Sequence, residues 1–283
     1  MTVLESIQKS AEFLAKKGVE SPRLHAELLL AHVLKLPRMK LYLNFERALA
    51  PAEMDGLREL VRRRGLREPL QHITGSTSFC GLEIAVNRHV LIPRPETELL
   101  AEAGGSFLST LNSQPSTALD FGTGSGCLAI ALAAKCSSAK IFALDVATDA
   151  LTLARQNAVA NKVASRIEFL QSDRFATLPD AIRFDLIISN PPYVPSAEIE
   201  SLEPEVRDHD PRLALDGGVD GLDFYRQLAT EARKFLKTNG KIMLEFGDGQ
   251  AEAIQKIFEN QNWVVEAVKD DYSQRPRILI VRC

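Results

Sequence analysis

Four consecutive residues, Asn190-Pro191-Pro192-Tyr193, have the side chains and the stiffness needed to hold a planar amino group. Each proline fixes φ and lacks a backbone N–H, and a residue before proline favours extended geometry. The Asn190 side-chain oxygen can accept one hydrogen of an –NH₂ group, and a proline carbonyl can accept the other. The Tyr193 ring can stack on the plane of that group, whose nitrogen would then point at an electrophile. On its own the tetrapeptide is more typical of a rigid turn after a strand, so the rest of the chain must decide.

A glycine-rich segment at residues 120–126 is a second candidate site. Glycines permit a tight turn and close approach of the backbone to a ligand, and the N-terminus of a following helix offers free N–H groups. Asp145 comes about 20 residues later, where an acid binds ribose hydroxyls in dinucleotide folds. The predicted cofactor-binding residues of this region are Gly122, Thr123, Gly124, Ser125, Gly126 and Asp145.

The spacing of these glycines helps to choose between cofactors. It is G-x-G-x-G, whereas nicotinamide dinucleotide folds favour G-x-G-x-x-G. Asp120 precedes the first glycine, and its charge would repel a pyrophosphate but attract a sulfonium. The segment therefore favours S-adenosylmethionine. The order of the glycine loop, the acid one strand later and Asn190–Tyr193 favours a methyltransferase.

Strand and helix patterns alternate after residue 117, which predicts a doubly wound α/β domain. The run at residues 184–189 is apolar and predicts a buried parallel strand, with Asn190–Tyr193 just beyond its carboxyl end. Ligands bind at that edge of such sheets. Predicted strands are residues 118–121, 140–144, 166–170, 184–189, 241–246, 264–268 and 277–281, and predicted helices are residues 127–134, 147–161, 221–236 and 250–260.

The first 75 residues predict a small helical bundle. Apolar spacing indicates a helix at residues 3–17 that Gly18 ends, and Ser21-Pro22 is typical of a helix start, with serine as the cap. A β-hairpin around Gly81 is expected within residues 76–90, before the α/β domain at residues 91–283. The arginines at residues 58–67 are expected to form a solvated helix end, with a docking patch for an acidic partner as the alternative.

Residues 91–98, Leu-Ile-Pro-Arg-Pro-Glu-Thr-Glu, predict a stiff extended segment followed by the first turn of a helix. Arg94 lies between the two prolines. We leave two roles open for it: a plain surface residue, or a clamp on a substrate or a loop.

Bulk properties limit the classes of function. The formal net charge of −3 over 283 residues argues against tight nonspecific binding of nucleic acid. No apolar run has membrane-spanning length, and no signal or transit peptide is expected. The cysteines form no C-x-x-C pair and the histidines no ligand spacing, so we expect reduced thiols, a cytoplasmic protein and no metal site.

The chain resembles the amino methyltransferases of the seven-strand S-adenosylmethionine fold, and most of all the peptide chain release factor N5-glutamine methyltransferases, the PrmC/HemK family. The resemblance covers nearly the whole chain. The matching motifs are residues 68–71 with 73–75, 92–98, 120–126, 190–193, and 210–212 with 214–215.

This resemblance implies a fold, a reaction and a set of roles. The fold would be a seven-stranded, Rossmann-like methyltransferase domain with an N-terminal bundle and hairpin that dock the substrate. The reaction would methylate the glutamine amide in the Gly-Gly-Gln motif of class I release factors, with S-adenosylmethionine as donor and a monomeric enzyme. Asn190 would contact both cofactor and substrate, while Pro191, Pro192 and Tyr193 would line the glutamine slot.

One position departs from the pattern of the family. Some members have a tryptophan beside the adenine where this chain has Arg174, after Gln-Ser-Asp. A guanidinium can stack on an adenine, so Arg174 remains a candidate cofactor residue, and Phe175 is expected to supply the apolar contact.

Three alternatives remain at this point. A nucleic-acid amino methyltransferase would use the same tetrapeptide on a flipped base, although the acidic balance and the N-terminal bundle count against it. A Rossmann-like binding protein would not need an intact glycine loop together with Asp145 and Asn190. A nicotinamide oxidoreductase is disfavoured by the glycine spacing.

Overall fold

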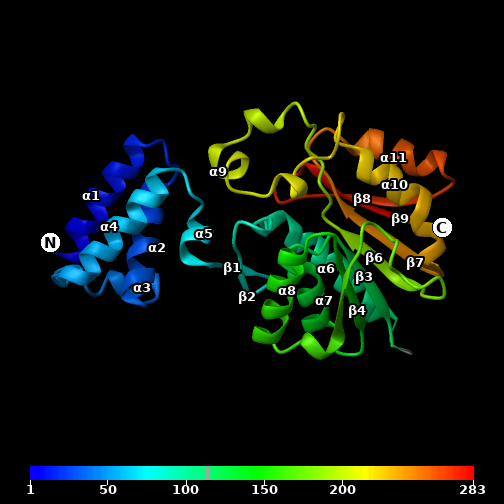
Figure 1. Ribbon diagram of the computed structural model, residues 1–283, viewed down its shortest axis with the longest axis horizontal. Coiled ribbons are helices and arrows are strands. Elements are labelled where there is room, and N and C mark those ends of the chain that lie inside the picture. Colours follow the sequence, from blue (N-terminus) through cyan, green and yellow to red (C-terminus); the bar gives the residue numbers. More distant parts are fainter. Residues whose placement is uncertain (112–114) are drawn as a thin grey trace. The chain divides into compact units, whose positions relative to one another are not determined.

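The computed structural model describes residues 1–111 and 115–283, which form two compact units. The first unit contains Met1–Ser76 together with Glu203–His209, and the second contains Thr77–Leu202 and Asp210–Cys283. No sequence pattern had indicated that a segment so late in the chain belongs with the N-terminal helices. Figure 1 colours the chain along its sequence, so both parts of the first unit can be followed there.

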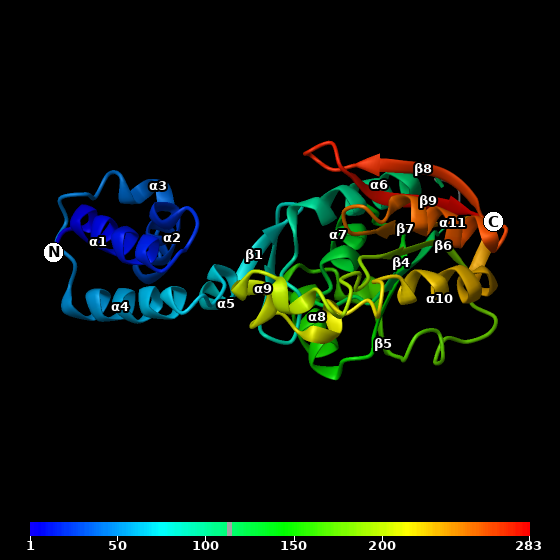
Figure 2. The same ribbon diagram turned by 90° about the horizontal axis from the view of Figure 1, so that it is seen from above.

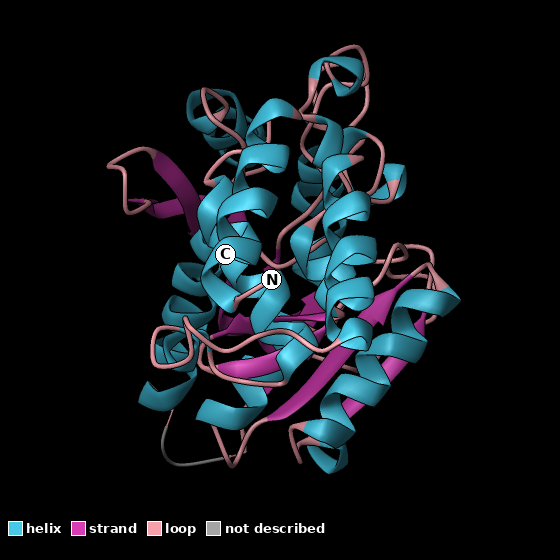
Figure 3. Cartoon of the chain, turned by 90° about the vertical axis from the view of Figure 1, so that its left-hand side faces the viewer, coloured by secondary structure: helices cyan, strands magenta, loops and turns pink. Residues whose placement is uncertain are grey.

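The first unit is built from helices (cyan in Figure 3), as its apolar spacing predicts. A capping box begins α1: the Thr2 hydroxyl oxygen accepts the Glu5 N–H, and the Glu5 carboxylate accepts the Thr2 N–H. Val3 and Leu14, on one face of α1, are buried in the core of this unit. The helices are α1 (Val3–Lys16), α2 (Pro22–Leu34), α3 (Arg38–Leu41), α4 (Pro51–Gly65), α5 (Leu70–Thr74) and α9 (Pro204–Arg207).

One predicted cap is wrong in detail. Ser21 is the N-cap residue of α2, but its φ is 47° and its side chain makes no capping hydrogen bond. Pro22 nevertheless occupies the first turn, where its fixed φ suits the helix and its missing N–H costs nothing.

The arginines at residues 58–67 pair with acids of their own unit. Arg58 and Arg62 are exposed and bond acids three residues earlier in α4, which fits the solvated helix end. Arg64 is buried, and it shares the Glu205 carboxylate with Arg67 at 2.6 Å from each guanidinium. Burial alone would raise the pKa of Glu205, but the hydrogen bonds from Arg67 and Arg64 outweigh it and hold the pKa at about 2. Arg64 and Arg67 therefore hold the segment Glu203–His209 within the first unit. They form neither the expected solvated helix end nor a docking patch for an acidic partner.

The second unit contains a seven-stranded sheet in the order β5-β4-β3-β6-β7-β9-β8. The strands from β5 to β7 run parallel, whereas β9 is antiparallel to both of its neighbours. Figure 2 shows β8 and β9 side by side at one edge of the sheet. The strands are β3 (Thr117–Phe121), β4 (Lys140–Asp145), β5 (Ile167–Gln171), β6 (Phe184–Ser189), β7 (Leu236–Glu245), β8 (Val264–Asp270) and β9 (Pro276–Arg282).

Helices cover both faces of this sheet, as the predicted doubly wound fold requires (Figure 1). Neighbouring residues of β3 face opposite cores: Ala118 packs with the helices α6, α7 and α8, and Leu119 with α10 and α11. The covering helices are α6 (Pro95–Thr110), α7 (Cys127–Lys135), α8 (Thr148–Ala160), α10 (Asp223–Glu231) and α11 (Ala251–Asn260), and the 3₁₀ turns are η1 (Ala164–Arg166), η2 (Ile199–Ser201), η3 (Arg212–Ala214) and η4 (Ala232–Phe235).

Two predicted boundaries differ from the structure. The helix expected at residues 221–236 is the shorter α10 followed by η4, and β7 begins at Leu236 rather than at residue 241. The hairpin consists of β1 (Ser76–Phe79) and β2 (Leu82–Ala85), which turn through Cys80 and Gly81, both with positive φ.

Candidate functional site

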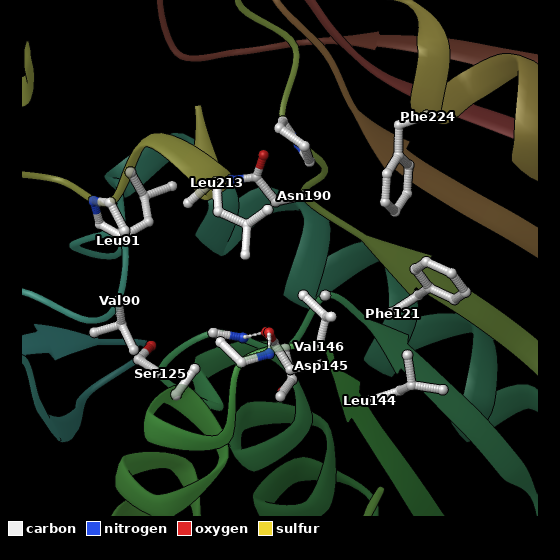
Figure 4. Close-up of a pocket in the computed structure, with 18 of the residues that line it drawn as sticks. Val90, Leu91, Phe121, Ser125, Leu144, Asp145, Val146, Asn190, Leu213 and Phe224 are labelled. Carbon is white, nitrogen blue, oxygen red and sulfur yellow. Dashed lines mark hydrogen bonds between the residues drawn. The ribbon is translucent and has the colours of Figure 1, made fainter. Parts of the chain in front are cut away.

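Three neighbouring parallel strands, β3, β4 and β6, end at the same edge of the sheet, and a cavity of about 800 Å³ lies beyond their carboxyl ends. This is where an open α/β sheet binds its ligand, and the volume is that of an ordinary small-molecule site. Figure 4 shows Asn190 and Leu213 across the cavity from Asp145 and Ser125. Of the predicted residues, the lining includes Gly122, Thr123, Gly124, Ser125, Asp145, Arg174, Asn190 and Pro192.

The glycine loop presents its backbone to the cavity. Gly122 and Thr123 each donate their N–H to the Leu144 carbonyl at 2.8 Å, so the loop is fastened to the end of β4. A Cβ at Gly122 or Gly124 would meet no atom within 4 Å, although their φ values of +75° and +54° strain other residues. A ligand can therefore lie directly against this backbone.

Asp145 holds the loop from the neighbouring strand. One carboxylate oxygen accepts the Gly124 N–H at 2.8 Å, and the other accepts the Ala147 N–H at 2.9 Å (dashed in Figure 4). Burial raises the pKa of Asp145, and these two hydrogen bonds oppose that rise. Each carboxylate oxygen keeps a further lone pair for a hydroxyl group of a ligand in the cavity.

Asp120 does not face the cavity, contrary to the expectation that its charge would attract a cofactor. It is fully buried, and one of its oxygens accepts the Thr123 hydroxyl at 2.6 Å and the Ala129 N–H at 3.0 Å. Burial raises its pKa to about 7. The side chain fastens the glycine loop to the start of α7 from beneath.

Asn190 lies just past β6 and lines the cavity. Its Nδ2 donates to Thr97 Oγ1 at 3.1 Å, and Thr97 belongs to the first turn of α6. The Asn190 Oδ1 atom is buried, and the described residues offer it no hydrogen-bond partner. A buried acceptor without a donor is costly, so this oxygen is suited to an N–H of a ligand.

The rest of the tetrapeptide is divided between the cavity and the protein. Pro192 lines the cavity, whereas Pro191 and Tyr193 are not part of its lining. The Tyr193 carbonyl accepts the Gln250 side-chain N–H at 2.9 Å, and its ring lies so close to Gly247 that a Cβ there would come within 2.9 Å. These contacts hold the segment in place, and the Tyr193 side chain is half-buried.

Arg94 clamps a loop, one of the roles left open for it. Its Nη2 donates to the Asp210 carboxylate at 2.6 Å, and the Asp210 side chain is only 1% exposed. Pro211 and Leu213, which follow Asp210, line the cavity. The ion pair thus connects the segment before α6 to a loop that forms part of the site.

Of three other residues expected at the cofactor site, one lines the cavity and two do not. Arg174 lines the cavity, with its side chain 60% exposed. Gly126 is absent from the lining. Its φ of +83° strains other residues, and a Cβ there would lie 3.0 Å from the Ala154 Cβ, so backbone conformation and helix packing both favour glycine. Phe175 supplies no cavity contact, because its ring stacks on Phe235 in the core.

Sequence reasoning missed several lining residues, notably Val90, Leu91, Phe224 and Leu213 (Figure 4). They come from loops and helix starts far apart in the chain, and of the four only Leu91 belongs to a segment with a recognisable pattern, residues 91–98. Thr97 was also missed, although its place directly after Arg94-Pro95-Glu96 in a motif segment was a usable signal.

Other features bear on the remaining expectations. Among residues 1–111 and 115–283, no helix is long and apolar enough to cross a membrane. In the same residues, no three His, Cys, Asp or Glu side chains are grouped to hold a metal ion.

Comparisons with known proteins agree with this geometry. Residues 5–75 match the family described as PrmC N-terminal domain, and residues 100–203 match the methyltransferase small domain. A protein of Geobacter sulfurreducens named release factor glutamine methyltransferase is 44% identical over 91% of this chain and 88% of its own length. A protein of Chlorobaculum tepidum with the same name is 44% identical over 98% of this chain and 95% of its own length.

The fold has solved counterparts. The crystal structure of a methyltransferase from Pyrococcus furiosus covers 71% of this chain and 88% of its own, with a TM-score of 0.50 and 22% identity. At that identity the likeness concerns the fold alone.

Proposed function

The chain belongs to the family of release factor glutamine methyltransferases, and we propose that it methylates the side-chain amide nitrogen, N5, of the glutamine in the Gly-Gly-Gln motif of class I release factors. The methyl donor is S-adenosylmethionine. The observation that carries the proposal is the unpaired, buried Asn190 Oδ1 atom at the edge of a cavity bounded by a glycine loop.

The residues present fit the cofactor. Asp145, already fixed by two backbone N–H groups, would hold ribose hydroxyls, while the loop from Gly122 to Ser125 would lie against the adenosine and amino acid portions. Arg174 lines the same cavity, and its side chain, which is 60% exposed and pairs with Asp173, would stack on the adenine. When bound, S-adenosylmethionine supplies an electrophilic methyl group on a positively charged sulfur.

Orientation is the main catalytic contribution that we assign to the protein. An amide nitrogen is a poor nucleophile because its lone pair is delocalised, and fixed geometry can contribute about 7–11 kcal/mol in favourable cases. Asn190 Oδ1 would accept one hydrogen of the glutamine –NH₂ group. The resemblance to the family assigns the other hydrogen to the Pro191 carbonyl, although Pro191 is not part of the cavity lining. Both acceptors would turn the nitrogen toward the cofactor.

Tyr193 and Pro192 would shape the glutamine slot. The Tyr193 ring is backed by Gly247 and its carbonyl is held by Gln250, so it can offer a fixed flat surface to the carboxamide. No histidine or cysteine base is required, because an alkylated amide nitrogen is strongly acidic and loses its proton readily.

We assign substrate docking to the first unit, residues 1–75, with the hairpin at 76–90 as the linker. Large apolar side chains are exposed on this unit, including Met39 at 70%, Leu43 at 77% and Leu66 at 65%. We propose these side chains as contacts for the release factor. We further propose that the enzyme acts as a monomer in the cytoplasm on protein rather than on nucleic acid.

Labelled S-adenosylmethionine tests the proposal. The full chain is incubated with a release factor whose Gly-Gly-Gln glutamine is intact or replaced by alanine, and in parallel with DNA and RNA. We expect label only on the intact release factor. Label on nucleic acid, or equal label on both release factor forms, would overturn the assignment of the substrate.

A further inference from the structure

A short chain of buried polar groups adjoins the Asn190 side chain. Thr97 Oγ1 accepts the Asn190 Nδ2 hydrogen at 3.1 Å. Beyond Thr97 lies Glu245, the last residue of β7, and burial raises the pKa of its carboxyl while the nearby Thr97 side chain opposes that rise. Thr97 and Glu245 are each 2% exposed, so water does not compete for these contacts.

Where the Thr97 hydroxyl sends its hydrogen decides how the Asn190 amide is oriented. A threonine hydroxyl has one hydrogen and two lone pairs. If Glu245 takes that hydrogen, Thr97 can offer Asn190 only a lone pair. The Asn190 amide must then turn its –NH₂ group toward Thr97 and its oxygen away, which is the orientation that leaves Oδ1 unpaired.

Neither Thr97 nor Glu245 is assigned a role by the proposed function, on which this inference rests. We propose that Thr97 and Glu245 are positioning residues that lock the Asn190 carboxamide with its oxygen toward the substrate amide. Without the lock, the –NH₂ group and the oxygen could exchange places, and a donor would face the –NH₂ group of the glutamine. Turnover would fall although the cofactor site is untouched.

Glu245 is held firmly enough for this role. The Tyr225 hydroxyl donates to the Glu245 backbone carbonyl at 2.8 Å, and β9 pairs with β7 up to Glu245 and Ile278. The carboxyl Oε2 is buried and without a hydrogen-bond partner among the residues that the structure describes. Buried carboxyls with shifted pKa values are frequent at functional sites.

The charged and titratable groups that face Glu245 come from four directions: Arg277 of β9, Arg94 and Glu96 at the start of α6, Tyr193 after β6, and Tyr225 of α10. Burial raises the pKa of Glu245 to about 7, while Thr97, Arg277 and Arg94 oppose the rise. Protonation would remove the negative charge of the carboxylate and so weaken its attraction for the Thr97 hydrogen, because hydrogen bonds to a charged acceptor are about twice as strong as neutral ones. Turnover should therefore decline as the pH falls below about 7.

Variants of Thr97 test the lock. Thr97→Val keeps the shape but removes the hydroxyl, and Thr97→Ser restores it. We expect Thr97→Val to lower kcat at least about tenfold, the rate equivalent of one lost hydrogen bond, with an unchanged Kd for S-adenosylmethionine. Thr97→Ser should recover most of kcat. Thr110→Val, an exposed position on the same helix, is the matched control.

Two further measurements separate positioning from a general packing role. In an Asn190→Ala background, Thr97→Val should cause no additional loss of kcat, because Thr97 acts only through Asn190; additive losses would overturn the proposal. Glu245→Gln should lower kcat and abolish its decline below about pH 7. The proposal is also rejected if kcat of Glu245→Gln still declines below about pH 7, or if Thr97→Val has the kcat of the wild type. If the wild-type enzyme does not methylate the release factor, the proposed function itself has failed.

Discussion

The Arg94 guanidinium reaches the buried Asp210 carboxylate at 2.6 Å and joins two segments that are far apart in the sequence but border one cavity. Arg94 is stiffened by the prolines on either side of it, and Asp210 immediately precedes Pro211 and Leu213 of the lining. The pair therefore positions a loop rather than a reacting group.

Arg94→Ala should loosen this loop. A hydrogen bond to a charged group contributes about 1.5–3 kcal/mol, so we expect a lower Tm and a several-fold weaker cofactor affinity, measured by calorimetry. Asp210→Asn should have a similar effect, and the double variant should be less destabilised than the sum of the two. Strict additivity would mean that the pair contributes nothing as a pair.

Asn190→Ala should lower kcat far more than it weakens cofactor binding. The variant removes an acceptor aimed at the substrate, and the loss of one such group typically costs about 10²–10³ in rate. The cofactor Kd should change only a few-fold, because Asp145 and the glycine loop remain. Unchanged turnover in single-turnover assays would remove Asn190 from the mechanism.

Local sequence patterns predicted the strands that end at the site, but they did not predict the long-range contacts between segments. The apolar runs of β3, β4 and β6 are buried on both faces, and such runs are readily recognised. The antiparallel direction of β9 and the return of Glu203–His209 to the first unit depend on distant contacts and have no local signature.

The prediction that Asp120 faces the cavity was wrong because it ignored the alternation of side chains along a strand. Successive side chains of a strand point to opposite faces, and Ala118 of β3 faces the core beneath α7. Asp120, two residues later, must share that side, which is where it meets the Ala129 N–H. Attention to this period of two would have placed its carboxylate under the loop instead of in the cavity.

Asp145→Asn should weaken the binding of S-adenosylmethionine by about tenfold or more. Charge-assisted hydrogen bonds are about twice as strong as neutral ones, and this change keeps the shape of the side chain while removing its charge. The Gly124 N–H would also lose a charged partner. Asp149→Asn, at an exposed position that also borders the cavity, is the control. Equal affinities for the two variants would contradict a ribose-binding role for Asp145.

Tyr193→Phe should have a mild effect on kcat, whereas Tyr193→Ala should reduce it strongly and raise KM for the release factor. The ring supplies the flat surface, and the described contacts of this residue are made by its ring and its carbonyl. Burial raises the pKa of the Tyr193 hydroxyl, which keeps it protonated at neutral pH. A large loss in Tyr193→Phe would show that the hydroxyl takes part in the reaction.

Acid should loosen the first unit through Glu205. Its pKa is about 2 in the folded protein, below the ordinary 4.5, because Arg67 and Arg64 hold the carboxylate. A lowered pKa means that the unfolded chain binds the proton more readily, so the stabilisation is complete above about pH 4.5 and is lost as the pH falls toward 2. Thermal unfolding followed between pH 7 and pH 2 should show a decline in Tm in this window. Glu205→Gln should lower Tm at pH 7 and flatten the decline, while Glu203→Gln, whose carboxylate is 76% exposed, should change little. A decline of equal size in Glu205→Gln would assign it to other carboxylates and remove this ion pair as the source of the acid sensitivity.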